Sequence, residues 1–281
     1  MREGSTVTQN LNEALAKVPA VTLAFWIVKI LATTLGETAG DALTMSWFGE
    51  TTEHPLFKDG HWGYLYGTLI LSVPLFLLVL TQIKASRFNV WLYWTTIIAS
   101  TTAGTTLADF CTRVLGEGTA ASYLLGSIIL LCCVLASLAV WRKVMGSIAV
   151  ESVHEPKAET FYWITITFSQ TLGTALGDWA ADTTLGGEPI GFTVGAILFA
   201  VLLLIVALLY FKTAISRAGL FWAAFILTRP LGATVGDLLD KPIAKGGLDF
   251  SRPLASVVLL VAIVACLFIW PQRAAAAGKS H

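Results

Sequence analysis

Residues 25–44, FWIVKILATTLGETAGDALT, place two carboxylates, Glu37 and Asp41, inside a segment that is otherwise strongly apolar. The same pattern returns at residues 93–112 (YWTTIIASTTAGTTLADFCT), 162–181 (YWITITFSQTLGTALGDWAA) and 221–240 (FWAAFILTRPLGATVGDLLD). Each copy opens with an aromatic residue and a tryptophan, and fifteen residues after the tryptophan comes an aspartate: Asp41, Asp109, Asp178 or Asp237. A glycine lies five residues before each aspartate, and a glycine or alanine directly precedes it. Because these spacings hold in all four places, we interpret the chain as an internal repeat.

The composition indicates a membrane protein. Of 281 residues, 56% are hydrophobic and 13% are charged, whereas soluble domains carry about a quarter charged residues. An apolar run follows each motif, at residues 66–80, 123–141, 190–211 and 253–270, and each run is near the ~20 residues that a helix needs to cross a bilayer. The sequence therefore predicts an all-α polytopic membrane protein, with eight transmembrane helices as four parallel two-helix repeats.

The predicted organisation is one transmembrane domain, residues 19–271, between an N-terminal arm (1–18) and a C-terminal tail (272–281). The repeats are expected at 19–83, 84–142, 157–212 and 213–271. Eleven lysines and arginines flank the helices on the side of the termini, against five on the other: Lys58, Arg113, Lys241, Lys245 and Arg252. The positive-inside rule then places both termini in the cytoplasm and the aspartates in the outer half of the membrane. Loop 48–61 is expected to cover an outer mouth.

The acids of the motif are predicted to face the interior of the bundle. Thr34, Glu37 and Asp41 share one helix face, and glycines such as Gly36 and Gly40 form a ridge beside it that favours close helix packing. A carboxylate that faces lipid costs about 2.5–3.5 kcal/mol on insertion scales. We therefore predict one intramembrane ion-binding site, with the four aspartates as candidate metal ligands; its members are Glu37, Asp41, Asp109, Asp178, Asp182, Asp237, Arg229, Lys29, Thr34, Thr102 and Thr171.

The two basic residues at this depth have alternative roles. Lys29 occurs in one repeat only, which indicates a specialised role, but an ion pair with Glu37 explains it as well. Arg229 is either a counter-ion or substrate contact, or a buried partner of Asp237 or a neighbouring acid. A surplus of carboxylates and hydroxyls suits a hard cation or a proton relay.

The repeat also resembles a known family. Typical copies of that family read G-E-T-x-G-D, as residues 36–41 do here. The family comprises bacterial membrane-anchored proteins that are built from a repeat of unknown function. The resemblance implies four two-helix repeats in the bacterial inner membrane, and it implies no activity.

The function expected from these features is secondary transport. We expect a proton-coupled transporter or exporter of a cation, for which a divalent metal such as Mn²⁺ is one candidate, with the lipid bilayer as its surroundings and no cofactor apart from the transported ion. The alternative is a non-transporting scaffold, sensor or accessory subunit whose acids hold helices together. No nucleotide-binding, protease or esterase motif and no basic cluster for nucleic acid is present in the sequence, so we expect no enzyme. An enzyme that acts on a lipid or a quinone is a weaker option.

Overall fold

The protein is built from helices that alternate between motif-bearing and apolar. The computed structural model describes residues 17–48, 62–116, 118–182, 184–185 and 188–275, so most of the arm, loop 48–61 and tail of the sequence analysis lie outside the described residues. The long helices of the described part are α2 (Leu23–Asp41), α3 (Trp62–Lys84), α4 (Val90–Asp109), α5 (Ala120–Met145), α6 (Pro156–Asp182), α7 (Gly191–Lys212), α8 (Arg217–Asp240) and α9 (Arg252–Ile269). A two-residue ladder pairs β1 (Thr184–Leu185) with β2 (Glu188–Pro189) between α6 and α7. The all-helical prediction is confirmed apart from this short hairpin.

The ends of the motif helices follow from local sequence. Thr22 begins α2 by accepting a hydrogen bond from the Phe25 amide at 3.3 Å, as N-capping hydroxyls do. After Asp41 and Asp109, the backbone opens into π-helical turns, η1 (Ala42–Trp47) and η2 (Phe110–Val114). These turns prolong the first two motif helices past their aspartates.

The four motif helices form an inner ring. α2 packs against α4 and α8, and α6 packs against the same two helices. The contacts join equivalent positions of consecutive repeats, and the fourth repeat closes on the first: Gly36 on Thr101, Gly104 on Gln170, Gly173 on Arg229 and Gly232 on Thr33. One turn further on, Gly40 meets Thr105 and Gly236 meets Glu37. Moving one turn toward the C-terminus on one helix thus also moves one turn toward the C-terminus on its neighbour, so neighbouring ring helices run in the same direction.

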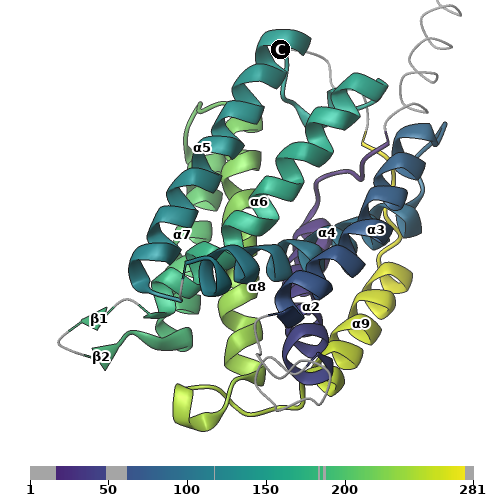
Figure 1. Ribbon diagram of the computed structural model, residues 1–281. Coiled ribbons are helices and arrows are strands. Elements are labelled where there is room, and N and C mark those ends of the chain that lie inside the picture. Colours follow the sequence, from purple (N-terminus) through teal and green to yellow (C-terminus); the bar gives the residue numbers. More distant parts are fainter. Residues whose placement is uncertain (1–16, 49–61, 117, 183, 186–187, 276–281) are drawn as a thin grey trace, which may run out of the picture.

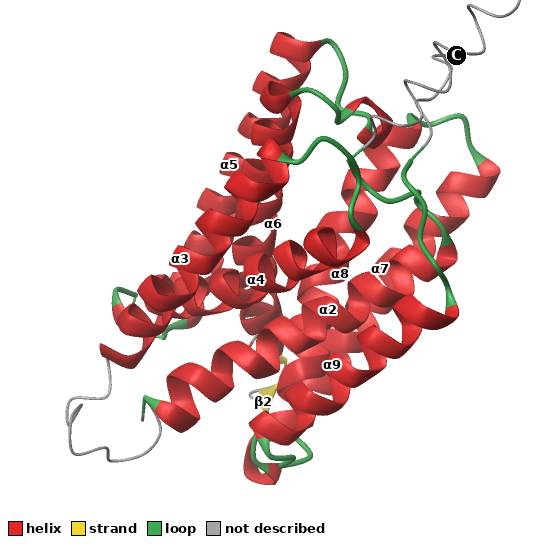
Figure 2. Cartoon of the chain, turned by 90° about the vertical axis from the view of Figure 1, so that its right-hand side faces the viewer, coloured by secondary structure: helices red, strands yellow, loops and turns green. Residues whose placement is uncertain are grey.

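The apolar helices form an outer layer around the ring. α3 packs against α4, α5 against α6, α7 against α8, and α9 against α2, and the two views show these helices on the outside of the bundle (Figures 1 and 2). Each apolar helix therefore covers the motif helix of the next repeat, and the last one returns to the first. Because α9 of the last repeat packs against α2 of the first, the two ends of the chain belong to one bundle.

Six of the described helical segments are long and apolar enough to cross a membrane: those containing α2, α3, α5, α7, α8 and α9. In the apolar windows of α2 and α8, 61% and 56% of the residues are buried, against 17% for α5, α7 and α9. Ring helices have protein on both sides and carry many threonines and small residues, which explains why α4 and α6 are less apolar. Membrane character is thus supported, and the number of eight crossings stays a prediction.

The two ends of the ring differ. At the start of the motif helices, buried aromatic rings such as Phe25, Trp94 and Trp222 fill the space between the helices. Beside them, the hydroxyls of Tyr93 and Tyr162 lie 2.6 Å apart in a hydrogen bond. The segment before α2 pairs with the segment after α9 through a bridge between residues 19 and 274, at the end opposite β1 and β2 (Figure 1). The motif helices end at the other side, where the acids lie.

Candidate functional site

A buried ion pair lies at the centre of the ring. Arg229 donates from Nη1 and Nη2 to Glu37 Oε2, at 3.0 Å each. The hydroxyls of Thr105 and Thr174 lie 3.3 Å from the same oxygen and also accept from Arg229. Glu37, Thr105, Thr174 and Ala233 occupy the same position in the four repeats. The ring therefore brings this position of each repeat to one centre, and in three repeats it carries a polar side chain.

The four aspartates lie one helical turn further along the ring helices, and two basic residues hold them. The Lys241 ammonium donates to Asp41 Oδ2 and lies 3.0 Å from Asp237 Oδ1. We call Asp41, Asp237 and Lys241 the Lys241 group. Each of its side chains is buried.

The other two aspartates are held in the same way. Arg113 Nε lies 2.7 Å from Asp109 Oδ1, and its Nη2 lies 3.2 Å from Asp178 Oδ2. We call Asp109, Asp178 and Arg113 the Arg113 group. Arg113 and Lys241 each follow the aspartate of their own repeat by four residues and reach the aspartate of the next repeat. The predicted set of four aspartates is thus divided into two groups, each organised around one base.

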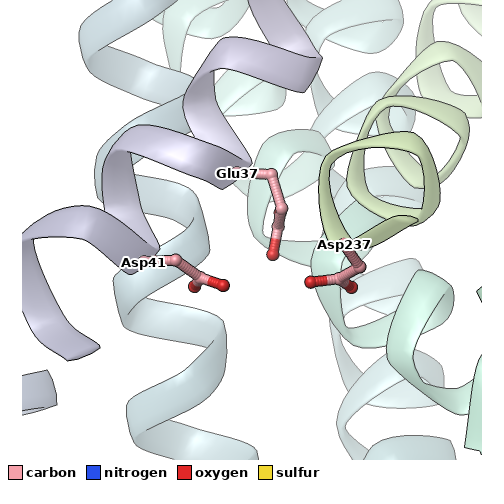
Figure 3. Close-up of side chains that lie close together, drawn as sticks. All are labelled: Glu37, Asp41 and Asp237. Atoms are coloured by element: carbon pink, nitrogen blue, oxygen red, sulfur yellow. The ribbon is translucent and has the colours of Figure 1, made fainter. Parts of the chain in front are cut away.

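One part of this region brings together three carboxylates that could hold a metal ion. Glu37, Asp41 and Asp237 each offer an oxygen, and these oxygens lie within 4.8 Å of one another. Figure 3 shows the three carboxylates turned toward a shared space, two from α2 and one from α8. Within the described part of the chain, Asp41 Oδ1 and Asp237 Oδ2 are buried without a hydrogen-bond partner. Carboxylate oxygens in such a cluster are ligands that hard divalent cations prefer.

A cavity of about 740 Å³ opens at this end of the ring. Both bases line it, so they lie between the cavity and the buried aspartates. Asp240 also lines the cavity, with Oδ1 4.0 Å from Lys241 Nζ and Oδ2 3.8 Å from Arg252 Nε. The remaining described lining residues are Met45, Ser46, Trp47, Tyr64, Pro242, Asp249, Phe250, Ser251, Arg252 and Pro253.

Lys29 lies away from the acids. Its ammonium sits 4.1 Å from the centroid of the Phe225 ring and has no hydrogen-bond partner among the described residues. Phe225 is the residue equivalent to Lys29 in the fourth repeat. The alternative of a Lys29–Glu37 ion pair is not seen, because Glu37 pairs with Arg229. Of the alternatives for Arg229, the structure shows a buried partner of a neighbouring acid.

The predicted threonine ligands are turned toward their own helices. The hydroxyls of Thr34, Thr102 and Thr171 each donate to the backbone carbonyl four residues earlier, as do many helical threonines. The threonines that reach the charged centre are Thr105 and Thr174. On α4 and α6, the residue that points to the centre of the ring is therefore Thr105 or Thr174, three residues after the predicted Thr102 or Thr171.

Three residues remain to be compared with the sequence analysis: the predicted site residue Asp182, and the bases Arg113 and Lys241, which were not predicted as site residues. Asp182 is the last residue of α6 and is exposed. Arg113 and Lys241 had been counted as loop charges, and the structure corrects this by placing both in ion pairs with buried aspartates. Their signal was the spacing of four residues after Asp109 and Asp237, which puts a base on the same helix face as the acid.

The fold and the site define a class of protein: a closed ring of four helical repeats, sheathed by apolar helices, with charged side chains at its centre. A family model described as Repeat of Unknown Function (DUF347) matches residues 24–88, 92–145, 161–216 and 220–273. The chain belongs to this family, and the resemblance drawn from the motif is confirmed. No curated protein and no solved structure matches the chain.

Proposed function

We propose that this protein is a secondary transporter that moves a cation across the bilayer in exchange for protons. The observation that supports the proposal most is the cluster of Glu37, Asp41 and Asp237, whose oxygens lie within 4.8 Å of one another below a cavity. Ionisable residues inside membrane segments are expensive to bury and mark ion or proton pathways. Here they come from the first and last repeats, at the junction that closes the ring.

The two ends of the ring suit alternating access. The cavity reaches the bases above the acids, whereas the opposite end is filled by aromatic side chains. We infer that the chain crosses a bacterial inner membrane eight times, with both termini in the cytoplasm and the cavity on the outer side. Arg113 and Lys241 no longer count as loop charges. Only Lys58, Lys245 and Arg252 then remain in the loops assigned to the outer side, against eleven bases on the side of the termini, and this larger difference strengthens the positive-inside argument.

The chemistry of the site favours a hard cation. Three carboxylates in one cluster provide oxygen ligands, and Arg229 neutralises one of them while holding Glu37 in place. A carboxylate oxygen that binds a cation can bind a proton in its place, as acids in proton-coupled transporters do. Cation and proton therefore compete for the same oxygens, which is the requirement for exchange.

Proteoliposomes test this function directly. With the full chain reconstituted and a pH-sensitive dye trapped inside, an inward Mn²⁺ gradient is expected to drive protons out of the vesicles. The Asp41→Asn variant should lose the signal, because it removes an acid of the Glu37–Asp41–Asp237 cluster. The Asp178→Asn variant should keep part of it, since Asp178 belongs to the Arg113 group. Equal signals from the two variants would reject the site, and the same absence of signal with Mn²⁺, Mg²⁺, Ca²⁺, Zn²⁺, Na⁺ and K⁺ gradients would reject cation–proton exchange.

A non-transporting scaffold is the second candidate, and one observation favours it. All four aspartates have a basic partner: Lys241 for Asp41 and Asp237, and Arg113 for Asp109 and Asp178. In this function the acids stabilise the closed ring. Aspartate-to-asparagine variants would then lower thermal stability in detergent, and the wild-type protein would drive no ion-dependent proton movement.

A further inference from the structure

The ammonium of Lys241 contacts two of the three acids that could hold a cation. Its Nζ contacts Asp41 Oδ2 and Asp237 Oδ1, which belong to two of the three acids in the metal-site cluster. The side chain is only 8% exposed, yet Lys241 lines the cavity that leads to the acids. An ion that arrives from the cavity meets this ammonium before it can bind both carboxylates.

We propose that Lys241 is a tethered competitor of the transported ion, and that the ion is a divalent cation. The proposal rests on the proposed function of the same site. With no ion bound, Lys241 compensates one of the two negative charges of Asp41 and Asp237, while Arg229 compensates Glu37. A divalent cation compensates both carboxylates after displacing the lysine, whereas a monovalent ion only replaces one positive charge by another.

The structure also provides a second place for the displaced ammonium. Asp240 Oδ1 is 4.0 Å from Lys241 Nζ and lines the cavity. Among the described residues, neither Asp240 carboxylate oxygen accepts a hydrogen bond, and Oδ2 lies 3.8 Å from Arg252 Nε in an ion pair. The flexible four-carbon stem of lysine allows the ammonium to turn from Asp41 to Asp240 by rotations of the side chain.

Arg113 provides a matched comparison within the same chain. It occupies the same position in the second repeat that Lys241 occupies in the fourth, and it also bridges the aspartates of two repeats. It differs in chemistry, because a planar guanidinium holds each carboxylate from a different nitrogen and stays protonated. The metal-site cluster found among the described residues does not include Asp109 or Asp178. We therefore infer that Arg113 is a fixed partner and Lys241 an exchangeable one.

Equilibrium binding measures this competition. Titration calorimetry of the purified full-length protein with Mn²⁺, Mg²⁺ and Ca²⁺ selects the ion that binds wild type. For that ion, Lys241→Gln is expected to raise the affinity by about tenfold or more, within the range of coupling between interacting sites. Lys241→Arg should bind no more tightly than wild type, since it keeps a cation at the site. Arg113→Gln should shift the affinity much less than Lys241→Gln, and Asp240→Asn should lower it because the displaced ammonium loses its second partner.

The outcomes separate this inference from the proposed function. If wild type binds the ion and Asp41→Asn does not, but Lys241→Gln leaves the affinity unchanged, the competition is refuted and the cation site remains. If neither wild type nor Lys241→Gln binds any of the three ions, the divalent site fails together with the inference. Should Lys241→Gln fail to fold, Lys241→Arg and Asp240→Asn decide: tighter binding by Lys241→Arg, or unchanged binding by Asp240→Asn, overturns the proposal.

Discussion

Replacing Arg229 by methionine should destabilise the protein strongly. Arg229 is fully buried and Glu37 is 1% exposed, so water does not screen the pair. Methionine keeps the Cβ and Cγ methylenes, which lie against Gly173, and removes the guanidinium. Glu37 is then left as a buried carboxylate without its base, which costs about 3–5 kcal/mol when one partner of a buried pair is removed. Unfolding free energies from denaturant titration in detergent, followed by tryptophan fluorescence, measure this loss.

A double-mutant cycle shows that the loss comes from the ion pair. In Arg229→Met with Glu37→Gln, no uncompensated charge remains, so at least half of the lost stability should return. Arg217→Met is the control: Arg217 lies on the same helix, is exposed, and its replacement should change stability by about 0.5 kcal/mol or less. A cost for Arg229→Met below about 1 kcal/mol, as for an exposed pair, or a double variant no more stable than the single one, would refute the reasoning.

Two further predictions concern the packing of the ring. Gly104→Ala should destabilise the protein by about 1–3 kcal/mol, because the added Cβ would lie 2.9 Å from Gln170 Cβ. The control is Gly219→Ala, where a Cβ has room, and in thermal unfolding this variant should melt at or above the wild-type temperature. Equal melting temperatures of the two variants would contradict the close approach of α4 and α6. Tyr93→Phe should cost about 1 kcal/mol in the same assay, since it removes the buried hydrogen bond to Tyr162, and an unchanged melting temperature would show that this contact is not a stabilising one.

The repeat motif made the close packing of the acid-bearing helices predictable. The conserved spacing within the chain indicated which helices carry acids, and ridges such as Gly36/Gly40 indicated close packing of those helices. Both features reappear as contacts of Gly36 with Thr101 and of Gly40 with Thr105. The physical reason is that a small residue at the same position in every repeat allows the same close contact with the next helix in every repeat.

The partners of individual charged side chains could not be predicted. A helix stripe is broad enough to contain both Thr34 and Glu37, and the sequence does not show which of its residues points at the axis. That depends on how the four helices are rotated against one another, which is a property of the packing. The same rotation pairs Arg229 with Glu37 and leaves Lys29 against Phe225.

Arg113 and Lys241 were missed for a different reason. A span of about 20 residues places the end of a transmembrane helix near the aspartates, so residues beyond them read as loop. In the structure, the turn η2 continues the chain past Asp109 as a helix and carries Arg113 back over the acids. The length of a span alone cannot show that bases beyond the aspartates fold back onto them and line the cavity.

The most direct test of the cation site is a crystal structure of the full chain grown with Mn²⁺, with anomalous diffraction to locate the ion. We predict one anomalous peak between the carboxylates of Glu37, Asp41 and Asp237, with the Lys241 ammonium moved to Asp240. The account would be contradicted by protein that shows no peak at saturating Mn²⁺ and still has Lys241 on Asp41, or by a peak bound only elsewhere on the molecule.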